Sequence, residues 1–372
     1  AVSRSQAREG MSIPSASSDR SPVTDSGRSL ADIFRRLIAA TGPISLAHYM
    51  AEANAHYYSK ADPLGTAGDF VTAPEISQMF GELIGLWLAD MWIRAGREEP
   101  VEYVELGPGR GTLARDALRA MKRYGLEPRA HFVETSTALK ELQLQAVPDA
   151  VFHHDLSTVP MDGPLLLVAN EFLDALPVRQ LIRTGAGWRE VMVAAEGERF
   201  VGIPGVRPMD AALPESRRGE PEGTLIETCP AAAAVLYEVA GRLANQGGAA
   251  LFIDYGHAED RTGSTFQAVR RHAKVDPFAA PGEADLTAHV DFAMLAQVAQ
   301  SRGAHWLGTT TQGEWLRALG IEGRAEALSE FAPQHREALH SAKHRLVDGD
   351  QMGELFKVMG LAAPDWPGGA GF

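Results

Sequence analysis

The stretch VEYVELGPGRGTLARD, residues 101–116, decides the fold. Its first six residues have the pattern of a buried strand, three glycines then make a turn, and a helical pattern follows from about Thr112 to Tyr124. Strand-like runs recur along the chain, with helical patterns between some of them, at residues 130–134, 151–154, 165–170 and 249–255. This alternation predicts an α/β fold with a doubly wound, mostly parallel sheet.

The glycine turn excludes two common phosphate-binding motifs. A dinucleotide fingerprint needs a third glycine at position 112, which is threonine, and the Gly-Lys-Ser/Thr ending of a P-loop is absent. A turn without side chains lets a nucleoside approach the backbone, and the acid before it can bind a cationic amino group or order the loop. The turn therefore predicts a phosphate-free cofactor held by Glu105, Gly107, Pro108, Gly109, Gly111, Thr112 and Leu113.

Acidic residues also end the next two predicted strands. Glu134 can accept hydrogen bonds from both ribose hydroxyls, and Asp155 can accept one from an adenine amino group. Each acid alone is explained equally well as a solvated strand end. Three acids at three successive strand ends favour S-adenosylmethionine over a nicotinamide cofactor. We expect the nearby Ser136 and Leu156, and Asn170 at the end of the fourth strand, to line the same site.

Composition limits the classes of function. The 372 residues carry a formal net charge of −13, so the average surface repels nucleic acid and favours a cationic partner. No window reaches the roughly 18 consecutive apolar residues that a membrane helix needs. The single cysteine, Cys229, allows no internal disulfide and fits a reducing compartment. The sequence therefore predicts a globular protein that binds no nucleic acid and has no membrane span.

Five segments differ in their pattern. Residues 1–28 lack periodicity and an apolar run, and we expect a disordered tail, with a mitochondrial transit peptide as the weaker alternative. Residues 29–98 are expected to form a helical cap with one long ordered loop. Residues 181–228 are expected to form an inserted β-rich segment. Residues 99–180 and 229–372 supply the two halves of the core, the second being mainly helical past residue 285 except for a last strand near residues 354–360.

Several separate blocks resemble the MidA-like family, and the likeness spans most of the chain. They include GDFVTAPEIS at 68–77, ELGPGRGTLARD at 105–116, VETSTALKELQ at 133–143, ANEFLDALPVRQ at 169–180, DYGH at 254–257, DLTAHVDF at 285–292 and TQGEWL at 311–316. One departure is Leu173, where the family often has a second Phe in its NEFFDALP block. The resemblance implies a class I methyltransferase fold that binds S-adenosylmethionine. The mitochondrial member of the family is a complex I assembly methyltransferase, and it implies symmetric dimethylation of an arginine on a protein substrate.

The carboxyl end of the fourth strand carries Asn170, Glu171 and Asp174. The methyl group of the cofactor should project beside them. An arginine acceptor needs carboxylates that orient the delocalised guanidinium and stabilise its charge. We therefore predict that these three residues are catalytic. Asp174 is suited equally well to cap a helix, and Asn170 could contact the cofactor instead.

Four further residues are predicted to bind substrate. Asp69 and Phe70 lie in the loop 68–77, which is placed to cover the cofactor and is equally well explained as a capped helix start. Tyr255 and His257 follow the fifth strand and should face the active edge of the sheet. His257 is a candidate general base, although packing of the loop is the favoured explanation and an arginine acceptor does not require a base.

No metal site is predicted. His153 and His154 are adjacent in a strand, so they point to opposite faces and cannot easily share one ion. Among His335, His340 and His344, only the last two form an i, i+4 pair, without an acidic partner at a compelling spacing. Asp285, His289 and Asp291 are explained better as a loop that braces the substrate channel than as metal ligands.

The leading hypothesis is a protein arginine N-methyltransferase whose protein substrate is a subunit of NADH dehydrogenase (complex I) or a similar protein. One alternative is a methyltransferase for a small molecule or another protein residue, and another is an assembly chaperone that binds the cofactor without turnover. The sequence is compatible with a homodimer. The expected compartment is the cytoplasm in a bacterium and the mitochondrial matrix in a eukaryote.

Overall fold

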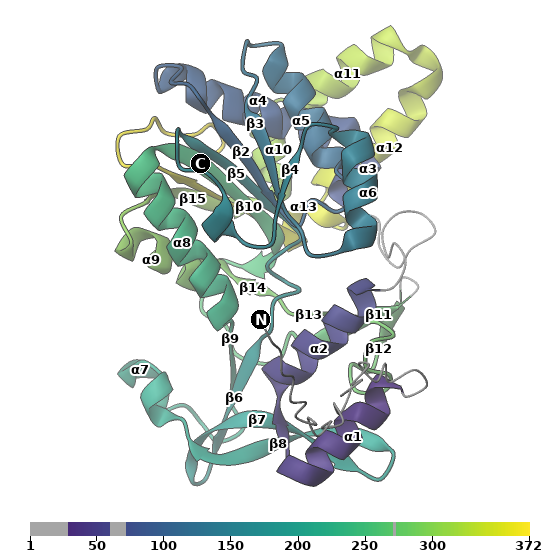
Figure 1. Cartoon of the computed structure of the whole chain (residues 1–372), viewed down its shortest axis with the longest axis vertical. Helices are drawn as coiled ribbons and strands as arrows, with labels where there is room; N and C mark the ends of the chain where they lie inside the picture. Colours follow the sequence, from purple (N-terminus) through teal and green to yellow (C-terminus); the bar gives the residue numbers. More distant parts are fainter. Residues whose placement is uncertain (1–28, 60–71, 271–272) are drawn as a thin grey trace, which may run out of the picture.

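The computed structural model describes residues 29–59, 72–270 and 273–372 (Figure 1). The predicted tail, residues 1–28, and the predicted substrate residues Asp69 and Phe70 lie outside the described residues. The described chain forms two lobes, with the large central sheet in the upper part of Figure 1 and a smaller antiparallel sheet in the lower part.

The central sheet has the strand order β15-β16-β10-β5-β2-β3-β4, and β14 pairs with the end of β10. Strands β4, β3, β2, β5 and β10 run parallel to one another, whereas β16 is antiparallel to both β10 and β15. The bounds are β2 (Glu102–Leu106), β3 (Arg129–Val133), β4 (Val151–His153), β5 (Leu165–Asn170), β10 (Gly248–His257), β14 (Val290–Asp291), β15 (His305–Thr311) and β16 (Phe356–Ala362). The predicted doubly wound, mostly parallel α/β sheet is confirmed.

Helices cover both faces of this sheet. Leu166 and Val168 of β5 pack into the core that contains α4 and α5, while Leu165 and Leu167 pack into the core that contains α8 and α9. Burial on two faces explains why β5, with the sequence LLLVAN, is almost entirely apolar. The bounds are α3 (Ala73–Ile76), α4 (Gln78–Arg94), α5 (Thr112–Lys122), α6 (Thr137–Ala146), α8 (Pro230–Gln246), α9 (Phe292–Ser301), α10 (Gln312–Ala318), α11 (Ile321–Phe331), α12 (Arg336–Val347) and α13 (Met352–Leu355), with 3-10 turns η1 (Leu156–Thr158) and η3 (Pro333–His335).

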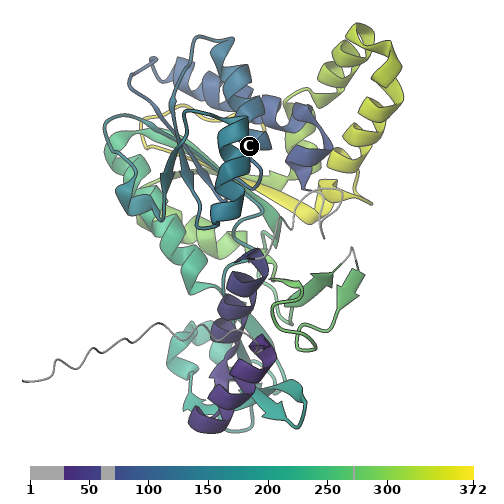
Figure 2. The same ribbon diagram turned by 45° about the vertical axis from the view of Figure 1, so that its right-hand side comes forward.

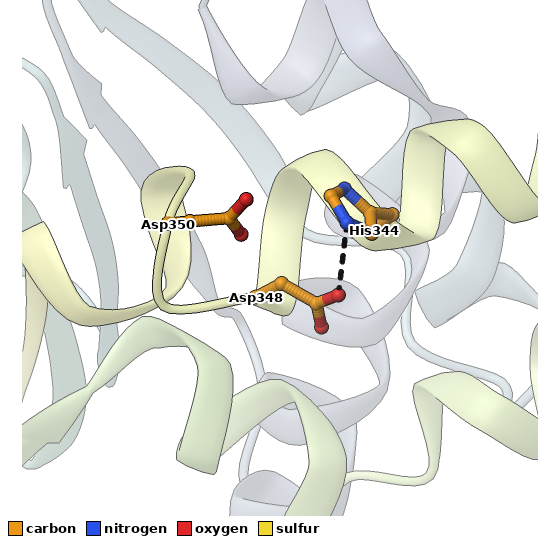
Figure 3. A group of neighbouring side chains, drawn as sticks. All are labelled: His344, Asp348 and Asp350. Carbon is orange, nitrogen blue, oxygen red and sulfur yellow. Dashed lines mark ion pairs between the residues drawn. The ribbon is translucent and has the colours of Figure 1, made fainter.

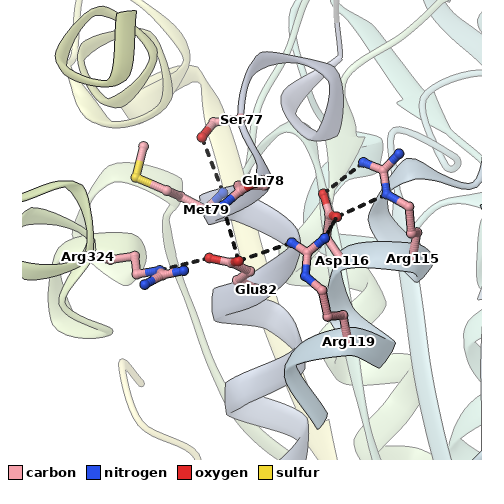
Figure 4. Close-up of polar contacts among 8 residues, drawn as sticks. All are labelled: Ser77, Gln78, Met79, Glu82, Arg115, Asp116, Arg119 and Arg324. Atoms are coloured by element: carbon pink, nitrogen blue, oxygen red, sulfur yellow. Dashed lines mark hydrogen bonds and ion pairs between the residues drawn. The ribbon is translucent and has the colours of Figure 1, made fainter. Parts of the chain in front are cut away.

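An ion-pair network joins α4, α5 and α11 on one side of the sheet (Figure 4). The buried Glu82 of α4 accepts hydrogen bonds from Arg119 of α5 at 3.1 Å and from Arg324 of α11 at 2.8 Å. Arg119 also pairs with Asp116 of its own helix, which Arg115 contacts as well. These contacts fix the helix that follows the glycine turn to the helices around it.

The second lobe combines the first two helices with an inserted antiparallel sheet (Figure 2). Phe34 of α1 and Tyr49 of α2 stack on each other, and Phe200 of β8 contacts both rings. A second small sheet, β12-β11-β13, lies beside α2. The bounds are α1 (Leu30–Thr41), β1 (Ile44–Ser45), α2 (Leu46–Ser59), β6 (Arg179–Thr184), β7 (Gly187–Glu196), β8 (Arg199–Pro208), η2 (Asp210–Ala212), α7 (Glu215–Arg218), β9 (Leu225–Thr228), β11 (Gln267–Arg270), β12 (Ala273–Val275) and β13 (Asp285–Thr287).

The chain past residue 285 is mainly helical and closes on a strand, β16, as the sequence predicts, although the short strands β13 and β14 and the strand β15 lie there as well. The N-terminal helices divide between the lobes, since α1 and α2 pack on the inserted sheet and α4 packs on the core. The proposed domain boundaries at residues 98, 180 and 228 stay a prediction.

Among the helices that the structure describes, none combines the length and the apolar character needed to cross a bilayer.

Candidate functional site

The glycine turn joins β2 to α5 with its backbone in the left-handed region. Gly107, Gly109 and Gly111 have φ values of 61°, 54° and 78°, which side chains disfavour. A Cβ atom on Gly107 would lie 2.9 Å from Cδ2 of Phe172, so the turn and the loop after β5 approach closely. Pro108 and Leu113 are buried, and Thr112 is the first residue of α5. The turn thus exposes backbone at the carboxyl edge of the sheet.

Glu105, the acid before the turn, is buried and paired. The hydroxyl of Tyr103 donates a hydrogen bond to its Oε2 at 2.7 Å. Burial raises the pKa of Glu105 to about 8, and the bond from Tyr103 opposes that rise. A cation brought to this carboxyl would favour its ionised form, so the pair is suited to receive a positively charged group.

Glu134 is tied directly to the glycine turn. It lies just past β3 and accepts hydrogen bonds from the Ser136 backbone N–H at 2.7 Å and from Gln143 Nε2 at 3.0 Å. The same Gln143 amide donates to the carbonyl of Gly109 at 2.7 Å. Because β2 and β3 are parallel neighbours, Glu134 and the turn share one edge of the sheet. Ser136 caps α6 by accepting from the Leu139 backbone N–H at 3.4 Å.

Asp155 lies past β4, farther along the same edge. Its Oδ1 accepts a hydrogen bond from the backbone N–H of Ser157 at 2.9 Å, which caps the turn η1. Hydrogen bonds from the hydroxyl and from the backbone N–H of Ser157 lower the pKa of the exposed carboxyl. The next residue, Leu156, is buried. The local cap explains the position of Asp155 without a ligand, and its role in adenine recognition stays a prediction.

The loop after β5 carries the predicted catalytic residues. Glu171 has φ of 49°, a left-handed value that is rare for a residue with a side chain, and its Oε1 accepts from Ala73 N at 3.3 Å and Asn170 Nδ2 at 3.2 Å. Burial raises the pKa of Glu171 to about 7, against the lowering effect of these two bonds. Burial and the nearby charge of Glu171 also raise the pKa of Asp174 to about 7. The loop therefore holds a half-buried carboxyl, Glu171, and a buried one, Asp174, and neither has a cation as ion-pair partner in the described residues.

Further acids and two tyrosines surround this pair. Asp254 of β10 and Asp285 of β13 are buried, and the hydroxyl of Tyr58 from α2 donates to Asp285 Oδ1 at 2.9 Å. Burial and the neighbouring acids raise the pKa of Tyr255, so its hydroxyl stays protonated. We call Glu171, Asp174, Asp254 and Asp285 the acidic cluster. Sequence reasoning did not assign Tyr58 or Asp254 to the site, although an acid inside the apolar run LFIDYG was a signal for Asp254.

The structure places the remaining candidates at the margin of the cluster. Tyr255 packs on Phe356 with ring centroids 4.1 Å apart. His257 Nδ1 lies 2.7 Å from the carbonyl oxygen of Glu259, so that nitrogen donates to the loop, and His257 shares a small cavity with Asp174. This bond supports the loop-packing interpretation of His257 over the general-base one.

One group in the described part of the chain has the geometry to hold a metal ion, His344 with Asp348 and Asp350 (Figure 3). His344 Nε2 lies 3.2 Å from Asp348 Oδ2. Arg317 also donates to Asp348 Oδ1 at 3.0 Å, so a cation already neutralises this carboxylate. We therefore interpret the group as an exposed ion-pair cluster. His153 ends β4 and is buried, whereas His154, the residue after the strand, is exposed.

A family model described as "Putative S-adenosyl-L-methionine-dependent methyltransferase" matches residues 83–310. Among curated proteins, the chain is 38% identical over 364 residues to the mitochondrial protein arginine methyltransferase NDUFAF7 of Mus musculus, with 87% of this chain and 82% of the relative covered. It is 36% identical over 395 residues to the homologue from Drosophila melanogaster, covering 94% of this chain and 89% of that protein.

Solved structures give the same result. A crystal structure from Burkholderia thailandensis bound to S-adenosyl-homocysteine matches with a TM-score of 0.79 at 29% identity, covering 92% of this chain and 93% of that chain. A native crystal structure from the same organism matches with a TM-score of 0.76 at 30% identity, covering 90% and 93%. The likeness thus includes both lobes and extends to a protein that binds the product of a methyl donor.

Proposed function

The chain belongs to this family of S-adenosyl-L-methionine-dependent methyltransferases, and on that premise we propose that it methylates an arginine side chain of a protein substrate. The cofactor is S-adenosyl-L-methionine. The observation that carries the arginine proposal is the pair of neighbouring carboxyls, the half-buried Glu171 and the buried Asp174, beside the carboxyl edge of the sheet.

The residues at this edge fit the cofactor. The left-handed glycines leave room for a nucleoside at the backbone, and the carboxyl of Glu105 is suited to an ammonium group. Asn170 Oδ1 is buried and has no hydrogen-bond partner in the part of the chain that the structure describes, so an acceptor is left for a ligand donor. We propose that Glu134 binds the ribose hydroxyls and that Asp155 and Leu156 adjoin the adenine. When bound, the cofactor supplies an electrophilic methyl group on a sulfonium.

A guanidinium is the acceptor that best matches the acidic cluster. Two carboxylates can bind its planar fork of N–H donors, and its charge offsets the repulsion between Glu171 and Asp174. These contacts hold the attacking nitrogen in line with the methyl–sulfur bond of the cofactor, and the exclusion of water strengthens them. A carboxyl whose pKa is about 7 can also accept the proton that the nitrogen releases on transfer.

The protein substrate is a cationic segment, in keeping with the net charge of −13 on the whole chain. Two relatives are named protein arginine methyltransferases, which supports the acceptor. The family resemblance further implies a subunit of NADH dehydrogenase (complex I). Of the alternatives, a small-molecule acceptor and a cofactor-binding chaperone make different predictions for turnover.

The test is transfer of a deuterated methyl group from S-adenosyl-L-methionine into host extract that lacks the endogenous enzyme. Mass spectrometry should find the label on arginine of one or a few proteins, and Glu171→Gln protein should label them far less. Label in a metabolite or on another residue would overturn the arginine assignment. No label in any molecule, despite binding of S-adenosyl-homocysteine, would favour the chaperone.

A further inference from the structure

The carboxylate of Asp254 lies at the centre of a ring of backbone N–H groups. Its Oδ2 accepts from the backbone of Phe172 at 3.1 Å, of Leu173 at 2.8 Å and of Asp174 at 3.2 Å. Its Oδ1 accepts from the backbone of Tyr255 at 2.9 Å. Asp254 is 1% exposed. Four donors on one buried carboxylate satisfy most of its capacity to accept hydrogen bonds.

These bonds hold a backbone reversal that would otherwise be unfavourable. β5 and β10 run in register to Asn170 opposite Ile253, and the Glu171 N–H still donates to the Ile253 carbonyl at 2.9 Å. At Glu171 the chain then turns into the left-handed region, which L-residues with side chains avoid. Consecutive N–H groups in such a turn converge on one point and form an anion-binding concavity. Asp254 fills that concavity from the neighbouring strand.

The reversal is what brings the carboxyls of Glu171 and Asp174 to one side of the loop. If the strand continued, these two residues would lie about 10 Å apart and, because they are three positions apart, their side chains would point to opposite faces of the sheet. The turned loop is held at its far end by separate contacts, since the Asp174 carbonyl accepts from Ala288 N at 3.0 Å and the Ala175 carbonyl from Asn54 Nδ2 at 3.0 Å. At the start of the loop, the side chain of Asp254 accepts hydrogen bonds from the backbone N–H groups of three successive residues, 172–174.

We propose that Asp254 is a positioning residue for methyl transfer: it builds the loop 171–174 through three backbone hydrogen bonds and so places Glu171 and Asp174 for the acceptor. The role rests on the proposed function of those two carboxyls. Both oxygens of the carboxyl accept in this arrangement. Burial and the charges of Asp174 and Glu171 raise the pKa of Asp254, and the bonds from the Asp174 and Leu173 N–H groups oppose that rise. An asparagine has a single acceptor oxygen, so its NH2 group would face either the N–H groups of the loop or that of Tyr255.

The experiment compares Asp254→Asn with wild-type protein and with Asp116→Asn, a control at a buried acid of α5 outside the site. In Asp254→Asn, amide hydrogen exchange at residues 172–174 should accelerate and kcat should fall, each by about tenfold to a hundredfold. The Kd for S-adenosyl-homocysteine should stay within about threefold, because the Gly107–Gly111 turn is untouched. Asp116→Asn should leave kcat and exchange at 172–174 unchanged. Equal loss of cofactor binding and kcat, or unchanged exchange at 172–174, would overturn the proposal.

Wild-type protein gives a second test if Asp254→Asn fails to fold. Residues 172–174 lie outside every strand and helix, yet the proposal requires their amides to be protected as strongly as those of β5. Exchange at the rate of an unstructured peptide would overturn it. This readout needs no acceptor, so it distinguishes failure of the positioning role from failure of the arginine assignment.

Discussion

Replacing Gly107 by alanine tests whether the left-handed turn serves cofactor binding. The residue has φ of 61°, and an added Cβ would lie 2.9 Å from Cδ2 of the half-buried Phe172. The left-handed conformation alone costs about 1–2 kcal/mol for alanine. Relief of the contact requires Phe172 or the turn to move. If the turn moves in the free variant and must return to the left-handed conformation when ligand binds, this cost of about 1–2 kcal/mol appears as an increase of roughly 5- to 30-fold in the Kd for S-adenosyl-homocysteine.

Gly125→Ala is a matched control for this substitution. Gly125 also has positive φ, 79°, but a Cβ there would meet no atom within 4 Å, and the residue lies after α5, away from the glycine turn. It should lower the free energy of unfolding by about 1 kcal/mol and leave the Kd unchanged. Calorimetric titration and thermal unfolding of both variants separate the two effects. The reasoning is refuted if Gly107→Ala binds S-adenosyl-homocysteine as tightly as wild type.

Three further predictions follow from the acidic cluster and the helix network. Glu171→Gln should lower kcat/KM for the protein substrate by about ten- to a hundredfold while the Kd for S-adenosyl-homocysteine changes little, because it removes a charged partner of the guanidinium; a Kd change as large as the loss of activity would contradict this. Initial rates should show kcat/KM rising with pH through about 7, since Glu171 and Asp174 must ionise to bind a cation. Denaturant titration should show that the unliganded protein loses stability as the pH rises from about 4 to 7, because the unfolded chain releases these two protons at lower pH than the folded protein does. If neither kcat/KM nor stability changes over this range, both carboxyls are excluded from these roles. Glu82→Ala should lower the free energy of unfolding by about 1–3 kcal/mol, because the bonds from Arg119 and Arg324 are lost. As a control, Glu127→Ala in the exposed Lys122–Glu127 pair should lower it by less than about 1 kcal/mol. Equal effects of the two substitutions would show that the network adds no stability.

The central strands could be predicted because burial on both faces leaves its mark on every residue. β2 and β5 are buried from end to end, and the apolar run LLLVA of β5 and the pattern VEYVEL around β2 stand out in the sequence. β12 and β15 gave no such signal, because the three residues of β12 are all exposed and β15 has the partly exposed sequence HWLGTTT. Their pairing depends on neighbours that are distant in the chain, which a local pattern does not record.

The candidate site shows the same division. Glu105, Glu134 and Glu171 could be predicted because each directly precedes or follows the end of a recognisable strand. Tyr58 could not, since it reaches the acidic cluster from α2, a helix that packs on the inserted sheet. The left-handed turn at Glu171 was also hidden, because it depends on a carboxylate from a different strand, 80 or more residues away.

Amino-acid analysis of the labelled protein product after complete hydrolysis tests the arginine acceptor most directly. The transferred methyl groups should be recovered on the guanidino nitrogens of arginine, and Glu171→Gln protein should give little of this product. Recovery of the label on lysine, histidine or a carboxyl group, at wild-type yield with Glu171→Gln, would contradict the assignment of the acidic cluster to an arginine acceptor.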